Sequence, residues 1–402
     1  MRTVLVTGPG GAGRTTLAAA TALAGARRGA RVLLLTTGSA APEAVLGSRL
    51  AADAATEIAP GLHARRIDPA DRFRQEFLAF QERAGAALDL LGAAPLEEDE
   101  LTELPGSEAF ALLHALRVEH GSDDWDTVVV DMPPAAETIQ LLALPAQVRR
   151  YLRRLLPPER QAARALRPVL AQLAGVPMPA QKLYEAAERW EGELAAVQRV
   201  IDDPGTSVRL VTEAGPVAAA NLRPLRAGLA LHGRRTDGVL VNRLLPTGSA
   251  DPFLAGLSGS QQSALKALRE EFPDLPLHEV PHLGRDPQGT EELDELIDGP
   301  ACEIGEIGEG RPAAGKLDPW TVEDRLTDDG ILVWRVPLPG AERDTLGLVR
   351  RGDEIVVSAG RFRRIRTLPS ALRRCTVSGA GLRDGVLEIR FTPDPALWPQ
   401  SH

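Results

Sequence analysis

The sequence contains very little cysteine. Only Cys302 and Cys375 occur, they lie far apart, and neither belongs to a C-x-x-C motif. A single chain therefore cannot build a disulfide framework, a thiolate zinc site or a paired-thiol metalloid site. A reducing compartment suits such a chain, and we expect the protein to be cytoplasmic.

Long hydrophobic runs and an excess of basic charge are also missing. The longest uncharged apolar run, Thr15–Ala26, is too short to span a bilayer, and the first residues lead as an apolar strand into glycines, unlike a signal peptide. The 55 acidic residues outnumber the 46 basic ones, which gives a net charge of −9. We therefore expect a soluble protein with no transmembrane segment of its own and no nucleic-acid partner, although a local basic patch is compatible with this total.

Short, wholly apolar strands alternate with helices through most of the chain. The first forty residues read as a strand, a glycine-rich turn, a helix and a second strand. Strands of this kind are buried on both faces of a parallel sheet. Four more are predicted, at 126–132, 207–213, 237–245 and 277–281, and a long helical block at about 145–203 lies between the first two of these.

The hydrophobic period changes to two after a segment rich in glycine, proline and glutamate, Cys302–Lys316. Short alternating strands broken by turns such as Arg-Gly-Asp predict a small β-sandwich there. We place a first domain at 1–300, with a helical subdomain at about 69–205, a linker at 301–318 and the sandwich at 319–396.

The segment Gly8–Thr15 follows the phosphate-loop pattern, except that Arg14 stands where the pattern has lysine. It lies between a predicted strand and a predicted helix, where successive backbone N–H groups can surround a phosphate. Thr15 would offer its hydroxyl to Mg²⁺, and Asp131, at a strand end, would steady the metal. The alternative is a ligand-free glycine turn. The predicted fold class is α/β: a P-loop NTPase parallel sheet flanked by helices, with an inserted helical subdomain and a small C-terminal β-sandwich.

At these residues the chain resembles a known family. The double-glycine loop followed by Thr15 and Thr16 is similar to the deviant Walker A motif of the arsenite-pump ATPases (ArsA) and the tail-anchored-protein targeting ATPases. The C-terminal part resembles the α-crystallin-like domain fused to some bacterial and plastid members. Similarity continues in order at 33–40, 64–69, 103–113, 124–134, 211–215 and 239–246.

The resemblance implies a homodimer that encloses ATP or ADP with Mg²⁺, and it implies a set of binding residues. Asn242 matches the position that reads adenine, although a strand-end asparagine is also a plain turn-former. Thr15 and Asp131 are implied as metal-binding residues, and no zinc is expected. The implied nucleotide-binding residues are Gly8, Gly10, Gly11, Ala12, Gly13, Arg14, Thr15, Thr16 and Asn242.

The sequence departs from the family where catalysis is concerned. Pro9 replaces the signature lysine that reaches the partner's nucleotide, and it also lacks a backbone N–H. Arg14 replaces the loop lysine, and its planar fork differs from a compact ammonium. Gly38 stands where the family has the aspartate that positions the attacking water, and switch II reads D-M-P-P-A-A-E-T at 131–138. We therefore assign no catalytic residue and predict binding with slow or absent hydrolysis.

Three functional hypotheses follow from the sequence. The first is an ArsA-family ATPase-like protein that binds nucleotide, hydrolyses it weakly or not at all, and holds a hydrophobic client or membrane-protein segment. The second is an active ATPase that energises an ion pump of the arsenite type or partitions cargo. The third is a chaperone-like binding module that needs no nucleotide.

Four further patterns have competing interpretations. The sequence H-E-V-P-H at 278–282 matches the H-E-x-x-H motif of zinc proteases, but its internal proline and the apolar context predict a strand. The segment 148–156 is a basic amphipathic helix. We interpret it as a helix whose basic face is solvated and whose apolar stripe packs on the core, and the alternative is contact with a membrane surface or an acidic partner. The arginines of 361–366 are predicted to lie mostly on one solvated face of the sandwich. An apolar helical stripe suits either a core or a client groove; it comprises Leu183, Ala187, Trp190, Leu194, Val197 and Ile201.

Overall fold

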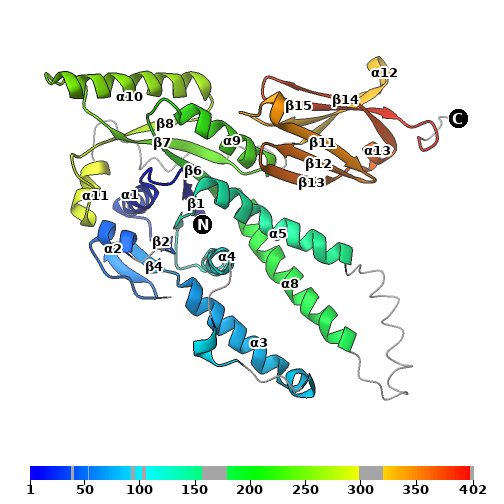
Figure 1. Cartoon of the computed structure of the whole chain (residues 1–402), viewed down its shortest axis with the longest axis horizontal. Coiled ribbons are helices and arrows are strands. Elements are labelled where there is room, and N and C mark those ends of the chain that lie inside the picture. The colour runs from blue at the N-terminus through cyan, green and yellow to red at the C-terminus, as the bar shows by residue number, and fades with distance from the viewer. Residues whose placement is uncertain are drawn as a thin grey trace.

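The structure is a computed structural model of the chain, and it describes residues 1–37, 40–52, 54–91, 96–101, 106–155, 179–297 and 320–398. An α/β lobe holds the first part of the chain, and a β-sandwich holds the last described part (Figure 1). This arrangement confirms the predicted fold class. The predicted linker at 301–318 lies outside the described residues, so the domain limits remain predictions.

One eight-stranded sheet forms the centre of the α/β lobe, in the order β3-β4-β2-β5-β1-β6-β7-β8. Neighbouring strands are parallel, except that β3 and β4 are antiparallel. The six predicted strands are present, including β8 across the H-E-V-P letters. The strands are β1 Arg2–Thr7, β2 Val32–Thr36, β3 Thr56–Ala59, β4 Leu62–Arg66, β5 Thr127–Asp131, β6 Thr206–Glu213, β7 Thr236–Leu244 and β8 Leu277–Pro281.

Two strands were not predicted, β3 and β4, because they lack a continuous apolar run. They lie at one side of the sheet, where β3 is the edge strand, and of their nine positions only Leu62 and Ala64 are buried. Central strands such as β2 are buried at every position, which is why an all-apolar sequence identifies them.

Helices cover both faces of the sheet (Figure 1). One face packs its core against α1 Arg14–Arg27, α2 Ala40–Leu46 and α11 Gly289–Ile297, through residues such as Leu17, Leu46 and Leu293. The other face packs against helices that contribute Leu112, Ile139, Ile201, Leu229 and Leu265. These helices are α4 Ser107–His120, α5 Ala135–Leu155, α8 Pro179–Asp202, α9 Ala218–Leu231 and α10 Pro252–Glu271.

The helices α5 and α8 extend away from the sheet together with α3 Pro69–Leu91, and a short 3₁₀ turn, Glu98–Glu100, follows α3 (Figure 1). The helical block predicted at about 145–203 therefore begins inside α5, and its residues 156–178 lie outside the described part. Within the described residues, the structure has no helix both long and apolar enough for a bilayer.

The C-terminal sandwich consists of two antiparallel sheets, in the orders β14-β15-β10-β9 and β11-β12-β13. Its core includes Trp334, Phe391 and Ile355, and the rings of Trp320 and Trp334 meet edge to face at 5.1 Å. β9 was not predicted, since its sequence T-V-E-D-R is mostly polar and exposed. The elements are β9 Thr321–Arg325, α12 Leu326–Asp329, β10 Ile331–Pro337, a 3₁₀ turn Arg343–Thr345, β11 Leu346–Arg351, β12 Glu354–Ala359, β13 Phe362–Thr367, α13 Ser370–Arg373, β14 Cys375–Arg383 and β15 Val386–Pro393.

The sandwich packs on α9, so that one hydrophobic core runs from the sheet through this helix into the sandwich. Arg364 of β13 donates a hydrogen bond of 2.7 Å to the carbonyl oxygen of Leu231 at the end of α9. Arg150 of α5 also pairs with Glu354 of β12 at 2.6 Å. The lobe and the sandwich are thus joined by apolar packing and by polar contacts.

Candidate functional site

The glycine loop lies between β1 and α1, and its backbone is tightly held by two neighbouring strands. A Cβ on Gly8 would overlap the carbonyl oxygen of Val211 in β6, and a Cβ on Gly13 would overlap Nδ2 of Asn242 at the end of β7. Gly13 also has a left-handed φ of 88° and precedes the first turn of α1 without a side-chain cap. These two positions therefore require glycine, and the first N–H groups of α1 face the loop without a capping side chain.

Asn242 supports the loop directly. It is buried, and its Nδ2 donates a hydrogen bond of 2.9 Å to the carbonyl oxygen of Ala12. A cavity of about 20 Å³ beside it is lined by Thr16, Asn242 and the segment 281–287. This space suits about one water molecule and is too small for a nucleobase.

Thr15 and Asp131, the two implied metal-binding residues, lie in contact. The Thr15 hydroxyl donates to Oδ2 of Asp131 at 2.7 Å, and the Thr36 hydroxyl approaches the same oxygen at 3.5 Å. Desolvation by burial raises the pKa of Asp131, against the opposing effects of the two hydroxyl groups and the nearby charge of Arg14.

Arg14 is turned toward the end of β5, where its Nη1 donates to the carbonyl oxygen of Met132. The following segment is held close to the loop as well: the amide of Ala135 donates to the carbonyl oxygen of Gly8 at 3.1 Å. The Thr7 and Thr138 hydroxyls both donate to the carbonyl oxygen of Pro133 at 2.7 Å. The structure therefore brings the glycine loop and residues 131–138 together, with Arg14 between them.

The loop tip is open to solvent. Gly10 and Gly11 are exposed, and Pro9, which replaces the signature lysine, is half-buried. Gly38, the third replaced position, lies outside the described residues. Of the remaining implied residues, Thr16 lies in the first turn of α1 and lines the small cavity beside Asn242.

Sequence reasoning missed Arg243. Its Nη1 donates to the carbonyl oxygen of Gly11 at 3.1 Å and pairs with Glu213 at 2.7 Å, and its Nη2 lies 3.4 Å from Asp286. Its φ of 59° is uncommon for a residue with a side chain and turns the chain at the end of β7. The sequence signal was a cation directly after Asn242, inside the family-like segment 239–246, to which no role was assigned.

The apolar stripe of α8 is buried at one end and exposed toward the other. Ile201 and Val197 are buried, Leu194 and Ala187 are half-buried, and Trp190 is 52 % exposed. The Trp190 ring lies 6.0 Å from that of Phe110 on α4, which is itself partly exposed. The side chain of Leu183 lies outside the described residues. The stripe is core near the sheet and an accessible apolar surface farther along the helix.

The basic helix predicted at 148–156 contains four arginines, and three of them have carboxylate partners within the protein. Arg149 and Arg153 both contact Glu191 of α8, at 3.1 and 3.4 Å, and Arg150 contacts Glu354 of the sandwich. These residues therefore connect α5 to its neighbours and do not form a purely solvated face.

Comparison with known proteins places these features in context. The family model for the anion-transporting ATPases matches residues 1–299, and a model for the HSP20-like domain found in ArsA matches residues 329–391. An uncharacterized protein of Streptomyces coelicolor is 53 % identical over all of both chains. A putative arsenical pump-driving ATPase 1 of Aquifex aeolicus is 27 % identical over 93 % of this chain and 95 % of its own. The ATPase GET3 of Chaetomium globosum is 25 % identical over 74 % of this chain and 89 % of its own.

Proposed function

Since the chain belongs to the anion-transporting ATPase family and ends in an HSP20-like domain, we propose that it binds ATP or ADP with little or no hydrolysis and holds a hydrophobic client. One observation supports this most directly. The Thr15–Asp131 pair is set beside an intact glycine loop, whereas Arg14 occupies the lysine position and bonds to a backbone carbonyl. The groups that would bind a nucleotide are present, whereas the cationic side chain at the lysine position is different.

The residues present fit a nucleotide with magnesium. The uncapped first turn of α1 and the glycine backbone offer N–H donors to phosphate oxygens. Thr15 and Asp131 together present the hard oxygen ligands that Mg²⁺ prefers. Magnesium, when bound, would neutralise charge on the phosphates. Asn242 would bind the base, as the resemblance implies, once the adjoining segment has moved.

The same residues fit hydrolysis poorly. Pro9 has no cation and no N–H to offer across a dimer interface. The Arg14 guanidinium is larger than an ammonium and donates to Met132 rather than pointing into the loop. Fast cleavage of a phosphate bond requires donors that are placed for the transition state.

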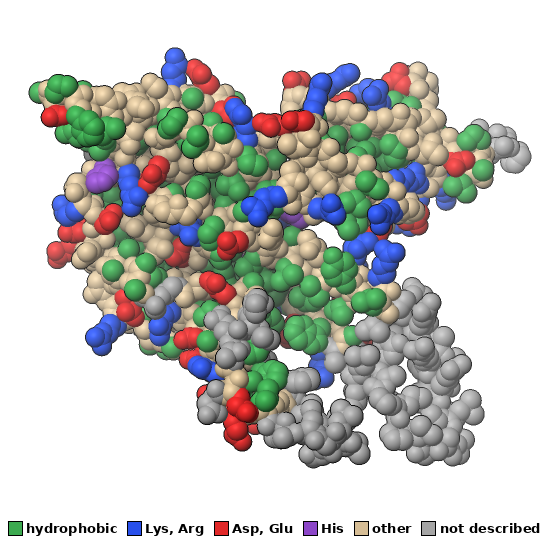
Figure 2. All heavy atoms as spheres, in the orientation of Figure 1, with side chains coloured by type: hydrophobic (Ala, Val, Ile, Leu, Met, Phe, Trp, Pro, Cys, Tyr) green, Lys and Arg blue, Asp and Glu red, His purple; other side chains and the backbone are tan. Residues whose placement is uncertain are grey.

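An accessible apolar surface supports the client. On α4, α5 and α8, the side chains of Phe110, Leu144, Tyr151, Leu155 and Trp190 are exposed by 38 % to 76 %. Figure 2 shows hydrophobic side chains gathered over α5 and α8. Exposed apolar side chains that gather in this way are typical of a surface that binds another apolar segment. The client would be a membrane-protein segment or another apolar stretch.

We also propose that the protein forms a homodimer in the cytoplasm. The exposed loop tip at Gly10 and Gly11 leaves room for a second subunit. An apolar group at the start of α10 suits contact between copies: Phe253, Leu254 and Leu257 are exposed there. The cysteine content, with Cys375 free and buried, suits a reducing cytoplasm.

Nucleotide binding is tested by Gly13→Ala, with Gly29→Ala as the matched control. Both glycines have a φ near 90°, 88° and 89°, so alanine introduces the same backbone strain. Only at Gly13 would the new Cβ displace Asn242, whereas a Cβ on Gly29 would meet no heavy atom within 4 Å outside the adjoining residues. We expect calorimetric titration to show that ADP binds the parent and Gly29→Ala alike, and at least about tenfold more weakly to Gly13→Ala. Analytical sedimentation of the same samples measures their mass and shows whether the protein is a dimer. Absence of ADP binding to the parent, or equal affinity in all three proteins, would contradict the proposal.

Client binding is tested by Phe110→Ser/Trp190→Ser. The control is Val322→Ser/Val349→Ser, which removes two exposed side chains from the sandwich. We expect the first pair to weaken binding of a synthetic peptide of about 20 apolar residues by at least about tenfold, because full burial of even one large apolar side chain contributes roughly 1.5–3 kcal/mol. Light scattering and pull-down of a labelled peptide measure the effect. An equal loss in both variants would mean that the aromatic pair does not form the client surface.

A further inference from the structure

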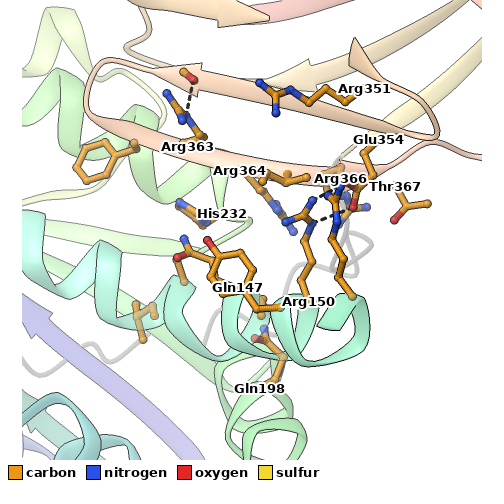
Figure 3. Close-up of a pocket in the computed structure, with 18 of the residues that line it drawn as sticks. Gln147, Arg150, Gln198, His232, Arg351, Glu354, Arg363, Arg364, Arg366 and Thr367 are labelled. Carbon is orange, nitrogen blue, oxygen red and sulfur yellow. Dashed lines mark hydrogen bonds and ion pairs between the residues drawn. The ribbon is translucent and has the colours of Figure 1, made fainter. Parts of the chain in front are cut away.

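A large cleft separates the helical part of the α/β lobe from the sandwich. It has a volume of about 1280 Å³ and lies between α5 on one side and the β12–β13 hairpin on the other, with the end of α9 between them (Figure 3). Nine of the side chains that line it are arginines, and only two are carboxylates, Asp353 and Glu354. This is a strongly basic surface in a chain whose net charge is −9.

Some of these arginines are neutralised by neighbours. Arg150 donates two hydrogen bonds to Glu354, at 2.8 and 2.6 Å, and Arg234 pairs with Asp202 at 2.5 Å. By contrast, Arg351, Arg361 and Arg363 form no ion pair with any carboxylate in the described part of the chain. Two carboxylates, Glu191 and Glu354, therefore balance only part of the charge of the four arginines on α5. The sandwich wall also carries an excess of positive charge.

Two further arginines of the sandwich wall are held in place. The guanidinium carbons of Arg364 and Arg366 lie 5.4 and 5.2 Å from the ring centre of Trp320. The predicted single solvated face of residues 361–366 is therefore wrong, because Arg361 and Arg363 face solvent whereas Arg364 and Arg366 cover an indole. These cation–π contacts restrict the two guanidinium groups, so less conformational entropy is lost when they bind an anion.

His232 directly follows α9 and lines the cleft. It is buried, and its pKa is lowered to about 3, first by burial and then by the charges of Arg364 and Arg234. The imidazole therefore stays neutral at physiological pH and does not add to the charge of the arginines. Figure 3 shows Arg364, Arg366, Arg150 and His232 directed toward the space between the two walls.

We propose that this cleft binds a soluble oligophosphate, an anion with several linked phosphate groups. Planar guanidinium forks match pairs of phosphate oxygens, and several of them together select for multiple charge. The volume exceeds that of a typical small-molecule pocket, so an extended anion fits better than a single phosphate. Among the aromatic side chains that line the cleft, only Tyr151 is exposed, which provides little stacking for single-stranded nucleic acid.

The test uses the full-length protein and linear inorganic tripolyphosphate, titrated by calorimetry with ADP present in excess. The variant Arg361→Gln/Arg363→Gln removes two solvent-facing charges from the cleft. Its matched control, Arg374→Gln/Arg383→Gln, removes two exposed charges from the same sandwich outside the cleft. We expect the cleft variant to bind tripolyphosphate at least about tenfold more weakly, because hydrogen bonds to charged groups are lost. The control and Gly13→Ala should bind it like the parent.

Other outcomes would overturn the proposal. An equal loss in both arginine variants would indicate a general charge effect, and binding that is lost when ADP fills the glycine loop would place the anion in that loop. Equal affinity for a hexaglutamate peptide would reject phosphate as the recognised group. Sedimentation with vesicles of phosphatidylcholine and phosphatidic acid, without binding of free tripolyphosphate, would identify a membrane surface instead. Melting temperatures of the variants near that of the parent show that folding is intact.

Discussion

In single-turnover assays with Mg²⁺, the protein is expected to hydrolyse ATP at least about a hundredfold more slowly than its Pro9→Lys/Arg14→Lys variant. The two lysines restore the cations at the positions where the family resemblance implies them. Loss of one transition-state donor typically lowers a rate by ~10²–10³, and loss of a cation supplied across a subunit interface lowers it by ~10³–10⁵. Since such losses are not additive, the expected gain is set at the lower value.

Phosphate release from radiolabelled ATP measures this difference. Pro246→Lys is the control, because it adds a positive charge on an exposed turn that follows β7 without entering the loop. If the parent already hydrolysed ATP at ordinary ATPase rates and Arg14→Ala abolished that activity, the replaced residues would not be the cause of slow hydrolysis. An active pump-energising ATPase would then be the better description.

The second large effect concerns stability. Gly8→Ala is expected to lower the free energy of unfolding by about 3 kcal/mol, whereas Gly10→Ala, two residues away, changes it by less than ~0.5 kcal/mol. The new Cβ at Gly8 would overlap the backbone carbonyl of Val211, which cannot move without separating β1 from β6. No atom lies within 4 Å of a Cβ at Gly10.

Thermal and urea unfolding followed by circular dichroism compare the two alanine variants. Equal midpoints would mean that the first glycine of the loop tolerates a side chain and that the contact between the loop and β6 is loose. Because both variants have the same composition and lie in the same loop, the difference isolates the close approach of the backbone to Val211.

The sequence predicted those parts of the fold that depend on local pattern. Strands such as β2 and β5 contain continuous apolar runs. The period-two segments form β10 to β15, and the turns between them contain the glycines that predicted them. Thr15 and Asp131 were paired because their positions after a loop and at a strand end have known consequences in a parallel sheet. The structure places their oxygens 2.7 Å apart, but their role in binding metal remains a prediction.

What the sequence missed depends on contacts between distant residues. Arg243 reaches the carbonyl of Gly11 across 232 positions, and its effect on the loop has no local signature. The basic cleft combines Arg150 of a helix with Arg366 of a strand, and no spacing rule connects them. The alternation of residues 361–366 was read correctly as a strand, but a buried indole beneath one face could not be foreseen from it.

The continuous core through α9 has a thermodynamic consequence. Proteins built from two lobes often melt in two steps, since each lobe has its own interior. Here the interior of the sandwich, with Trp334 and Phe391, is contiguous with that of the sheet, with Val239 and Leu210. Loss of either half would leave apolar residues of the shared helix in water. We therefore expect the α/β lobe and the sandwich to unfold as a single cooperative unit, with one peak in a calorimetric scan.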